Sequence, residues 1–214
     1  MSDVVAASTL SLGLSLTAVA LAAVPGIPLA AALGLARGRR RDALLVAARV
    51  AMSFPTVVVG LLVYGLLSRR GPLGGLGLLY TPTAIVAGEV LLALPLIVAL
   101  GAAAVGALDP RFRDTARSLQ LGAVRTARLA VGEARDGFVA ALLVAFARCV
   151  TELGVALLVG GNLRGSTRTL TTAIALETSR GDFAHGLALG AVLVAVAVLV
   201  NLVVAVGFRG AAPR

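Results

Sequence analysis

Side chains that could catalyse a covalent reaction are few and scattered in this chain of 214 residues. It contains one cysteine, Cys149, and one histidine, His185, and its acidic residues are spread singly along the sequence. A nucleophile with its base, or a set of metal ligands, requires several such groups in a recognisable pattern. The GxxxxGK[ST] motif that cradles nucleotide phosphates is also missing from the sequence. We therefore expect a protein that is not an enzyme and that holds no metal or cofactor itself.

Four charged residues stand inside otherwise apolar runs, where the chemistry open to them is ion pairing. Arg148 and Glu152 are separated by four positions, which places them one turn apart on the same face of a helix. Arg49 and Glu89 lie in two different runs, and either could be the partner of the other. Because an ionised group inside a bilayer is costly unless it is paired or faces a cavity, these residues either fix helix packing or line a pathway.

The apolar runs that must hold these charges dominate the composition. Hydrophobic residues make up 59% of the chain and the mean hydropathy is +1.00, well above the values of soluble domains. Since about 20 apolar residues are needed for one helical span, the pattern predicts an all-α integral membrane protein with one domain, residues 1–214, and about five transmembrane helices. The predicted spans are residues 10–36, 43–67, 83–108, 138–159 and 184–208.

The positive charges are distributed unevenly between the two sides of the predicted bundle. All 19 basic residues are arginines, and most of them follow the first span, follow the third span or lie in the C-terminal tail. Because short loops rich in arginine stay in the cytoplasm, the N-terminus is predicted outside and the C-terminus inside, in a bacterial or archaeal cytoplasmic membrane. A net charge of +9 that is sorted in this way indicates contact with membrane lipid rather than binding of nucleic acid.

The cytoplasmic loop of residues 109–135 interrupts the apolar pattern with a basic, helix-prone stretch. Residues 115–121 contain neither glycine nor proline, Asp114 can cap the start of a short helix, and Gly122 can end it in a left-handed conformation. A second amphipathic stretch follows. The loop could merely set the topology or touch anionic lipid, but its apolar positions, which include Leu119 and Val124, favour a partner with a groove.

This loop resembles the EAA loop of binding-protein-dependent ABC importer permeases of the type I fold. Asp114-Thr115-Ala116 stands where the family has Glu-Ala-Ala, and Gly122 stands at the family's glycine after two extra residues. The resemblance implies that a cytoplasmic coupling helix docks on an ABC ATPase subunit, which would bind the ATP and magnesium. The residues that would make this contact are Asp114, Thr115, Ala116, Arg117, Leu119, Gly122 and Arg125.

Three further segments strengthen the resemblance and narrow its cargo. Residues 68–74 and 146–154 resemble molybdate and sulfate permeases, and residues 159–183 are similar to tungstate permeases almost residue for residue. The family implies a homodimer that receives its cargo from an extracytoplasmic substrate-binding protein. The resemblance thus implies a tungstate importer. The same fold carrying molybdate or sulfate is one alternative, and a membrane anchor or scaffold that transports nothing is another.

Hydroxyl and arginine side chains gather after the fourth span, as a tetrahedral oxyanion would require. Such a dianion must exchange water for hydrogen-bond donors without being held too tightly to leave. The candidate residues for the path or for contact with the binding protein are Asn162, Arg164, Thr167, Arg168, Thr169, Thr171 and Thr172. The alternative is that these residues only cap a short re-entrant helix over residues 171–178.

Overall fold

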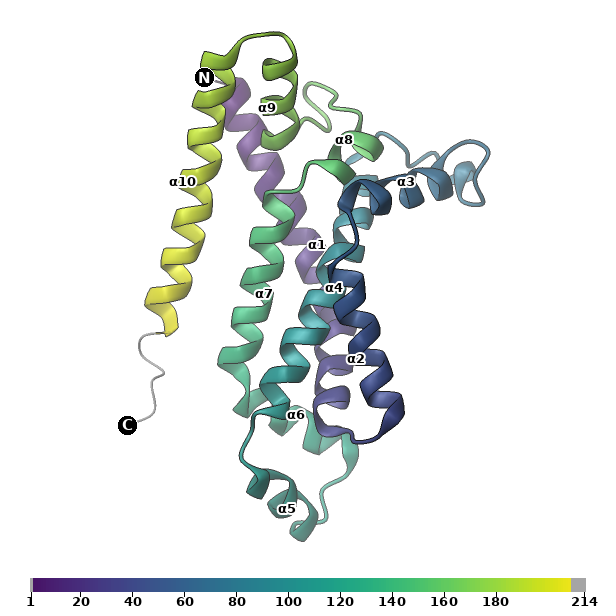
Figure 1. Cartoon of the computed structure of the whole chain (residues 1–214), viewed down its shortest axis with the longest axis vertical. Helices are drawn as coiled ribbons and strands as arrows, with labels where there is room; N and C mark the ends of the chain where they lie inside the picture. Colours follow the sequence, from purple (N-terminus) through teal and green to yellow (C-terminus); the bar gives the residue numbers. More distant parts are fainter. Residues whose placement is uncertain (1, 209–214) are drawn as a thin grey trace.

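The computed structural model describes residues 2–208, and every regular element in that range is helical (Figure 1). The helices are α1 (Ser2–Leu35), α2 (Arg39–Met52), α3 (Thr56–Leu67), α4 (Pro82–Gly106), α5 (Pro110–Ser118), α6 (Ala123–Glu133), α7 (Arg135–Val150), α8 (Gly154–Gly160), α9 (Leu170–Ser179) and α10 (Phe183–Phe208), with a 3₁₀ turn at Gly74–Leu76. Helices α5 and α6 lie at one end of the bundle and α8 and α9 at the other (Figure 1). These are called the α5 end and the α9 end below.

Helices α1 and α4 form the centre of the bundle; α4 closely matches the predicted range 83–108, whereas α1 begins eight residues before the predicted range 10–36. Their contact is close because small side chains line it: Ala22, Ala30 and Ala93 are completely buried. Each of the two helices is long and apolar enough to cross a membrane. Helix α10 coincides with the fifth predicted span and packs mainly against α9 and α7.

The prediction of one continuous span over residues 43–67 is wrong. Helices α2 and α3 meet at 96°, and α3 projects sideways from the α9 end of the bundle (Figure 1). The break is at Pro55, which precedes α3 in an extended conformation. Proline lacks the N–H that a continuing helix would use, and it disfavours helical geometry at the residue before it.

The predicted span over residues 138–159 is also broken, into α7 and α8, which meet at 56°. No proline causes this bend. The carboxylate of Glu152 accepts a hydrogen bond from the backbone N–H of Val155 at 3.1 Å and so starts α8 with a side-chain cap. Each bent pair is apolar enough to cross a membrane if it forms one span.

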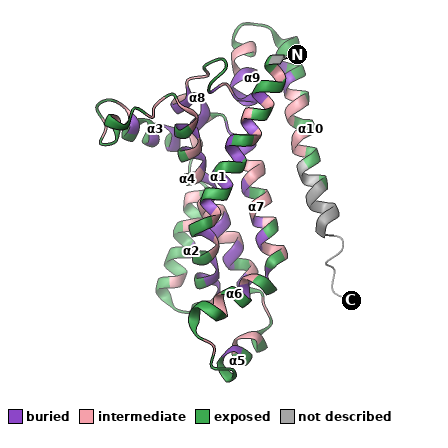
Figure 2. Cartoon of the chain, turned by 180° about the vertical axis from the view of Figure 1, so that it is seen from behind, coloured by how far each residue is buried: buried purple, intermediate pink, exposed green. Residues whose placement is uncertain are grey.

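Buried side chains run along the inside of the bundle and exposed ones along the outside (Figure 2). Three hydrophobic clusters follow one another along α1 and α4, and the one nearest the α5 end includes Leu33, Val105 and Phe138. Large apolar side chains on the outside, such as Val24 and Leu62, are more than half exposed. An apolar outer surface around a packed interior is the pattern expected of helices that face lipid.

Candidate functional sites at the two ends of the bundle

The α5 end carries the helix pair that the basic loop predicts, but α5 begins earlier than expected. Its N-cap is Asp109, whose Oδ1 accepts a hydrogen bond from the backbone N–H of Arg111 at 2.8 Å, and Pro110 occupies the first turn. The prediction that Asp114 caps this helix is therefore wrong. Asp114 lies on the exposed face of α5, 3.8 Å from Arg117. Proline suits the first turn of a helix because the N–H it lacks would have no partner there.

The turn between α5 and α6 also differs from the prediction. Gly122 has φ −65° and precedes α6, whereas Gln120 takes the left-handed conformation at φ 50°. Two bonds close the end of α5: Gln120 N–H donates to the Arg117 carbonyl at 2.9 Å, and Leu121 N–H donates to the Ala116 carbonyl at 3.0 Å. This is a Schellman motif. Gln120 and Leu121, the two residues that are additional to the pattern of the EAA loop, donate the two hydrogen bonds of this Schellman motif.

One arginine fastens α5 to the rest of the bundle. The Arg113 guanidinium donates to the Gly34 carbonyl at 2.7 Å, near the C-terminal end of α1. A cation at this position satisfies a carbonyl that the helix leaves free and is favoured by the helix dipole. From the second helix, the Arg41 Nε donates to the Leu33 carbonyl at 3.2 Å. Arg113 thus ties α5 to the end of α1, Arg41 ties α2 to it, and Ala116 is the buried residue of α5.

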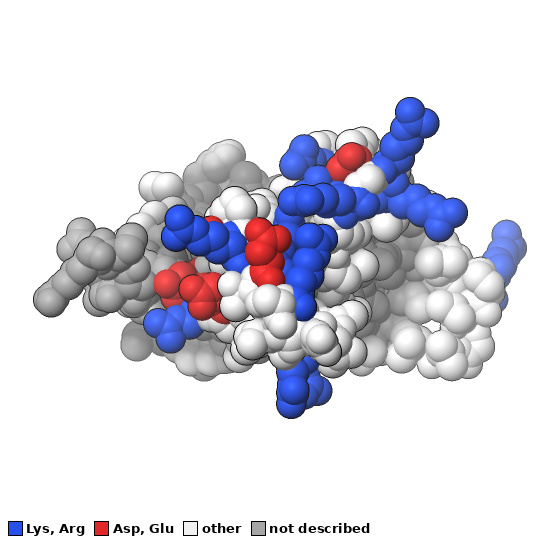
Figure 3. All heavy atoms as spheres, turned by 90° about the horizontal axis from the view of Figure 1, so that it is seen from below, with Lys and Arg blue, Asp and Glu red and all other residues white. Residues whose placement is uncertain are grey.

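The remaining predicted coupling residues lie on the surface of this end. Thr115, Arg117, Leu119, Gly122 and Arg125 are all exposed, and 64% of the surface of Leu119 is accessible. Seen from below, many arginine side chains are exposed at this end, with a few acidic side chains among them (Figure 3). The helix pair thus presents an apolar side chain among cations, which a protein surface with an acidic, grooved face can bind.

At the α9 end, the predicted threonines are engaged in the fold itself. Thr169 and Thr172 form a capping box at the start of α9, in which each side chain accepts a hydrogen bond from the other residue's backbone N–H. The Thr171 hydroxyl donates to the Glu152 carbonyl at 2.7 Å, and the Thr167 hydroxyl donates to the Gly160 carbonyl. All four are buried. Thr169 and Thr172 therefore cap α9, while Thr171 and Thr167 tie neighbouring segments together; α9 spans Leu170–Ser179 around the predicted residues 171–178.

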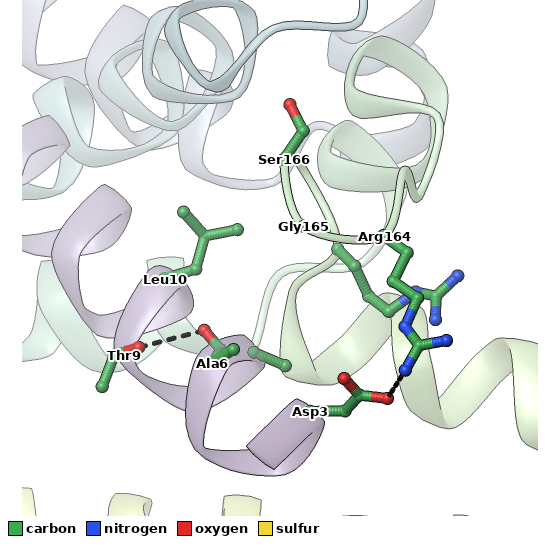
Figure 4. Close-up of a pocket in the computed structure, with 9 residues that line it drawn as sticks. Asp3, Ala6, Thr9, Leu10, Arg164, Gly165 and Ser166 are labelled. Carbon is green, nitrogen blue, oxygen red and sulfur yellow. Dashed lines mark hydrogen bonds and ion pairs between the residues drawn. The ribbon is translucent and has the colours of Figure 1, made fainter.

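The two predicted arginines, in contrast, face a pocket of about 490 Å³ (Figure 4). Arg164 points toward Asp3 of α1 and forms an ion pair with it. The Arg168 side chain is fixed by Asn162, because its Nε donates a hydrogen bond to the Asn162 side-chain oxygen at 3.1 Å. Sequence patterns did not identify Asp3, since it lies before the first predicted span and no local signal links it to a loop 161 residues away.

Two ion pairs were considered between the ends of the bundle, and the structure contains one of them, Arg148 with Glu152. The Arg148 guanidinium lies 2.8 Å from the Glu152 carboxylate. Glu89 does not meet Arg49: it is buried against α1, where the Ser15 hydroxyl lies 3.5 Å from its Oε1, and Arg49 is exposed on α2. The two residues sit in neighbouring helices but point to different sides, which their positions in the sequence do not reveal.

Comparison with known proteins shows which family this chain belongs to. Residues 26–214 match the family described as "Binding-protein-dependent transport system inner membrane component". A probable anion ABC transporter permease protein of Haloferax volcanii is 42% identical over 202 residues, covering 92% of this chain and 87% of that protein. The tungstate uptake system permease protein TupB of Campylobacter jejuni is 41% identical over 152 residues, covering 71% of this chain and 64% of that protein.

More distant similarities agree with these. The molybdenum transport system permease protein ModB of Azotobacter vinelandii is 32% identical over 207 residues, covering 92% of each chain. The crystal structure of an amino acid ABC transporter with histidines superposes with a TM-score of 0.70 over 97% of this chain and 94% of that one, at 16% identity, which supports the fold. The chain belongs to the binding-protein-dependent transport system inner membrane components, the permease subunits of ABC importers.

Proposed function

We propose that this permease carries tungstate into the cell, with energy from a separate ATPase subunit. The observation that carries the proposal is the placement of two unlike cationic sites at opposite ends of one helix bundle, a pocket with Arg164 and Arg168 and a surface built by α5 and α6. Relatives named for anion and tungstate transport, at 42% and 41% identity, support the cargo. The family favours transport over the alternative of a scaffold that moves nothing.

In this proposal the α5 end lies in the cytoplasm and the α9 end outside, so that the N-terminus is external and the C-terminus cytoplasmic. The arginine-rich loops at the α5 end support this orientation. Two copies of the chain form the path, an external binding protein delivers the anion to the α9 end, and two ATPases with ATP and magnesium act on the α5 end. The chain itself supplies no catalytic group and no cofactor.

The α9 end offers what a tetrahedral dianion needs. Guanidinium groups bind oxyanions through paired N–H donors, and Arg164 and Arg168 are close enough to line one pocket. The buried threonines act one layer behind them, by holding α8 and α9 in place. Size and charge differ little between tungstate, molybdate and sulfate, so the selection among them belongs to the binding protein as much as to this pocket.

The cargo can be tested through the delivery step. Proteoliposomes that contain the permease and its ATPase are supplied with binding protein loaded with tungstate, molybdate or sulfate, and ATP hydrolysis is measured. We expect the strongest stimulation with tungstate. Equal stimulation by molybdate, which the similarity to ModB over 92% of the chain makes the second candidate, would change the cargo but leave the importer role intact.

The coupling surface can be tested by charge reversal. Replacing Arg117 and Arg125 together by glutamate is expected to weaken ATPase binding about tenfold, because cations that face an acidic groove become anions. Affinity for the purified ATPase and stimulated ATP hydrolysis report the effect. Replacing Arg39 and Arg40 by glutamate changes the same number of charges at the same end, in the first turn of α2, and serves as the control. Equal losses in both double variants, or none in the first, would contradict docking on α5 and α6.

A further inference from the structure

The pocket at the α9 end is lined by a carboxylate of the chain itself, that of Asp3. Its walls come from the first turns of α1 and from the loop between α8 and α9, and the carboxylate of Asp3 points across it to the guanidinium of Arg164 (Figure 4). A carboxylate in this position presents the same kind of acceptor oxygens to the arginine as an oxyanion would. A site with two guanidiniums is thus partly neutralised by a group from a distant part of the sequence.

The two arginines of this pocket are held differently. Arg168 is half-buried and anchored on Asn162, both by Nε to the side-chain oxygen at 3.1 Å and by a second bond to the backbone carbonyl at 3.5 Å. Arg164 is 70% exposed and its partner Asp3 is 60% exposed. Ion pairs with this exposure are weak and exchange readily with solvent ions. The pocket therefore combines a fixed cation with one that can change partners.

Other polar groups around the pocket do not replace this pair. The Thr9 hydroxyl donates to backbone carbonyls of its own helix at 3.0 Å. The hydroxyl of Ser166 points away from Asp3 and Arg164 (Figure 4). Gly165 lies between Arg164 and Ser166 in the chain and also lines the pocket. It has φ 76° and open space where a Cβ would stand, so its backbone is accessible at the edge of the pocket. The charged donors that line the pocket are the two guanidiniums.

We propose that Asp3 is an internal counter-ion of this pocket, which an incoming tetrahedral oxyanion displaces from Arg164 on its way to binding between Arg164 and Arg168. The proposal rests on the function proposed above and adds a residue to it. No bond is made or broken: one ion pair is exchanged for another. The displaced carboxylate stays nearby and repels the bound dianion, so the site receives its cargo without retaining it.

Calorimetry with sodium tungstate on the purified complex of permease and ATPase, without binding protein, tests this exchange. Asp3→Asn removes the competing charge while keeping the side chain's size. We expect it to tighten tungstate binding about fivefold and to slow ATP-driven uptake at saturating tungstate. Asp3→Glu, which keeps the charge, should restore values near those of the original protein.

The matched control is Glu177→Gln. Glu177 pairs with Arg180 at 3.4 Å at the same end of the bundle but does not line the pocket, so its removal should leave tungstate affinity within twofold. Unchanged or weaker tungstate binding in Asp3→Asn would overturn the proposal. So would a change confined to the affinity for the binding protein, because that would make the pocket a protein contact. If the original complex takes up no tungstate from its binding protein, the proposed function fails instead, whatever Asp3 does.

Discussion

Replacing Glu152 by alanine is expected to lower the free energy of unfolding by about 3 kcal/mol, because the buried side chain joins the end of α7 to the start of α8. Its carboxylate pairs with Arg148 at 2.8 Å and caps α8 through Val155 N–H at 3.1 Å. The bond from the Thr171 hydroxyl goes to the backbone carbonyl of residue 152, which the substitution keeps. Glu152 is 3% exposed. The loss is at the lower end for a buried pair, since the Arg148 side chain is 40% exposed and keeps some access to other partners.

The chain provides its own probe for this measurement. Cys149 is the one cysteine of the sequence and is buried, so a thiol-reactive fluorescent dye labels it only as the bundle opens. We expect the midpoint of thermal unfolding to fall by roughly 10 °C. Glu152→Gln keeps an acceptor for Val155 and should lose less. Exchanging the two residues, with glutamate at 148 and arginine at 152, should be milder than either single charge loss if pairing dominates; a swap as harmful as Glu152→Ala would show that the cap dominates.

Gly101→Leu is expected to cost about 3 kcal/mol, because α1, α4 and α7 meet at this position without room for a side chain. A Cβ on Gly101 would stand 2.6 Å from Cε1 of the Phe138 ring and 2.9 Å from Cβ of Ala30. Neither neighbour can move aside cheaply: the phenyl ring is 4% exposed and Ala30 is completely buried on the facing helix. The helices must separate, and the same labelling of Cys149 should occur at a temperature lower by roughly 10 °C.

Gly106→Leu in the same helix is the control for this variant. Nothing lies within 4 Å of a Cβ at Gly106, so the substitution adds no contact and replaces a poor helix former by a good one. We expect its unfolding temperature to stay the same or to rise slightly. If both leucine variants were equally stable, the close packing of α4 on α1 and α7 would be contradicted.

Hydropathy alone located the spans that run straight and failed where a local interaction bends the chain. Residues 83–108 became α4 almost without change, because a run of small and branched apolar residues has no alternative to helix in lipid. In residues 43–67, Pro55 was a visible signal for the break, but the count of apolar residues passed over it. In residues 138–159, the break depends on where the carboxylate of Glu152 points, and that is a property of the folded chain.

The functional ends show the same division. The arginines at 164 and 168 were proposed as candidates because unlike residue types stand together in one short segment, and in the structure both line one pocket. Asp3 was missed because its contact joins positions 161 residues apart. The sequence left open whether Glu89 pairs with Arg49, because it gives the direction of neither side chain; in the structure Glu89 is buried against α1 and Arg49 is exposed. Asp109 rather than Asp114 starts α5, and here the following proline was a local signal that could have decided the matter.

Helix α1 is bonded to other segments at both of its ends, and two prolines interrupt its backbone hydrogen bonds in between. At the α9 end it meets the loop through Asp3 and through Ser11, whose hydroxyl oxygen accepts the Leu170 N–H at 2.8 Å; at the α5 end its last carbonyls accept Arg41 and Arg113. Pro25 and Pro28 lie inside it, so the carbonyls four residues before them have no helical donor. The turn that contains these two prolines therefore lacks two backbone hydrogen bonds of a regular helix, and we expect α1 to bend there most easily. Forces that act in opposite directions on the two ends of α1 would then bend this helix at one depth in the membrane, the turn with Pro25 and Pro28.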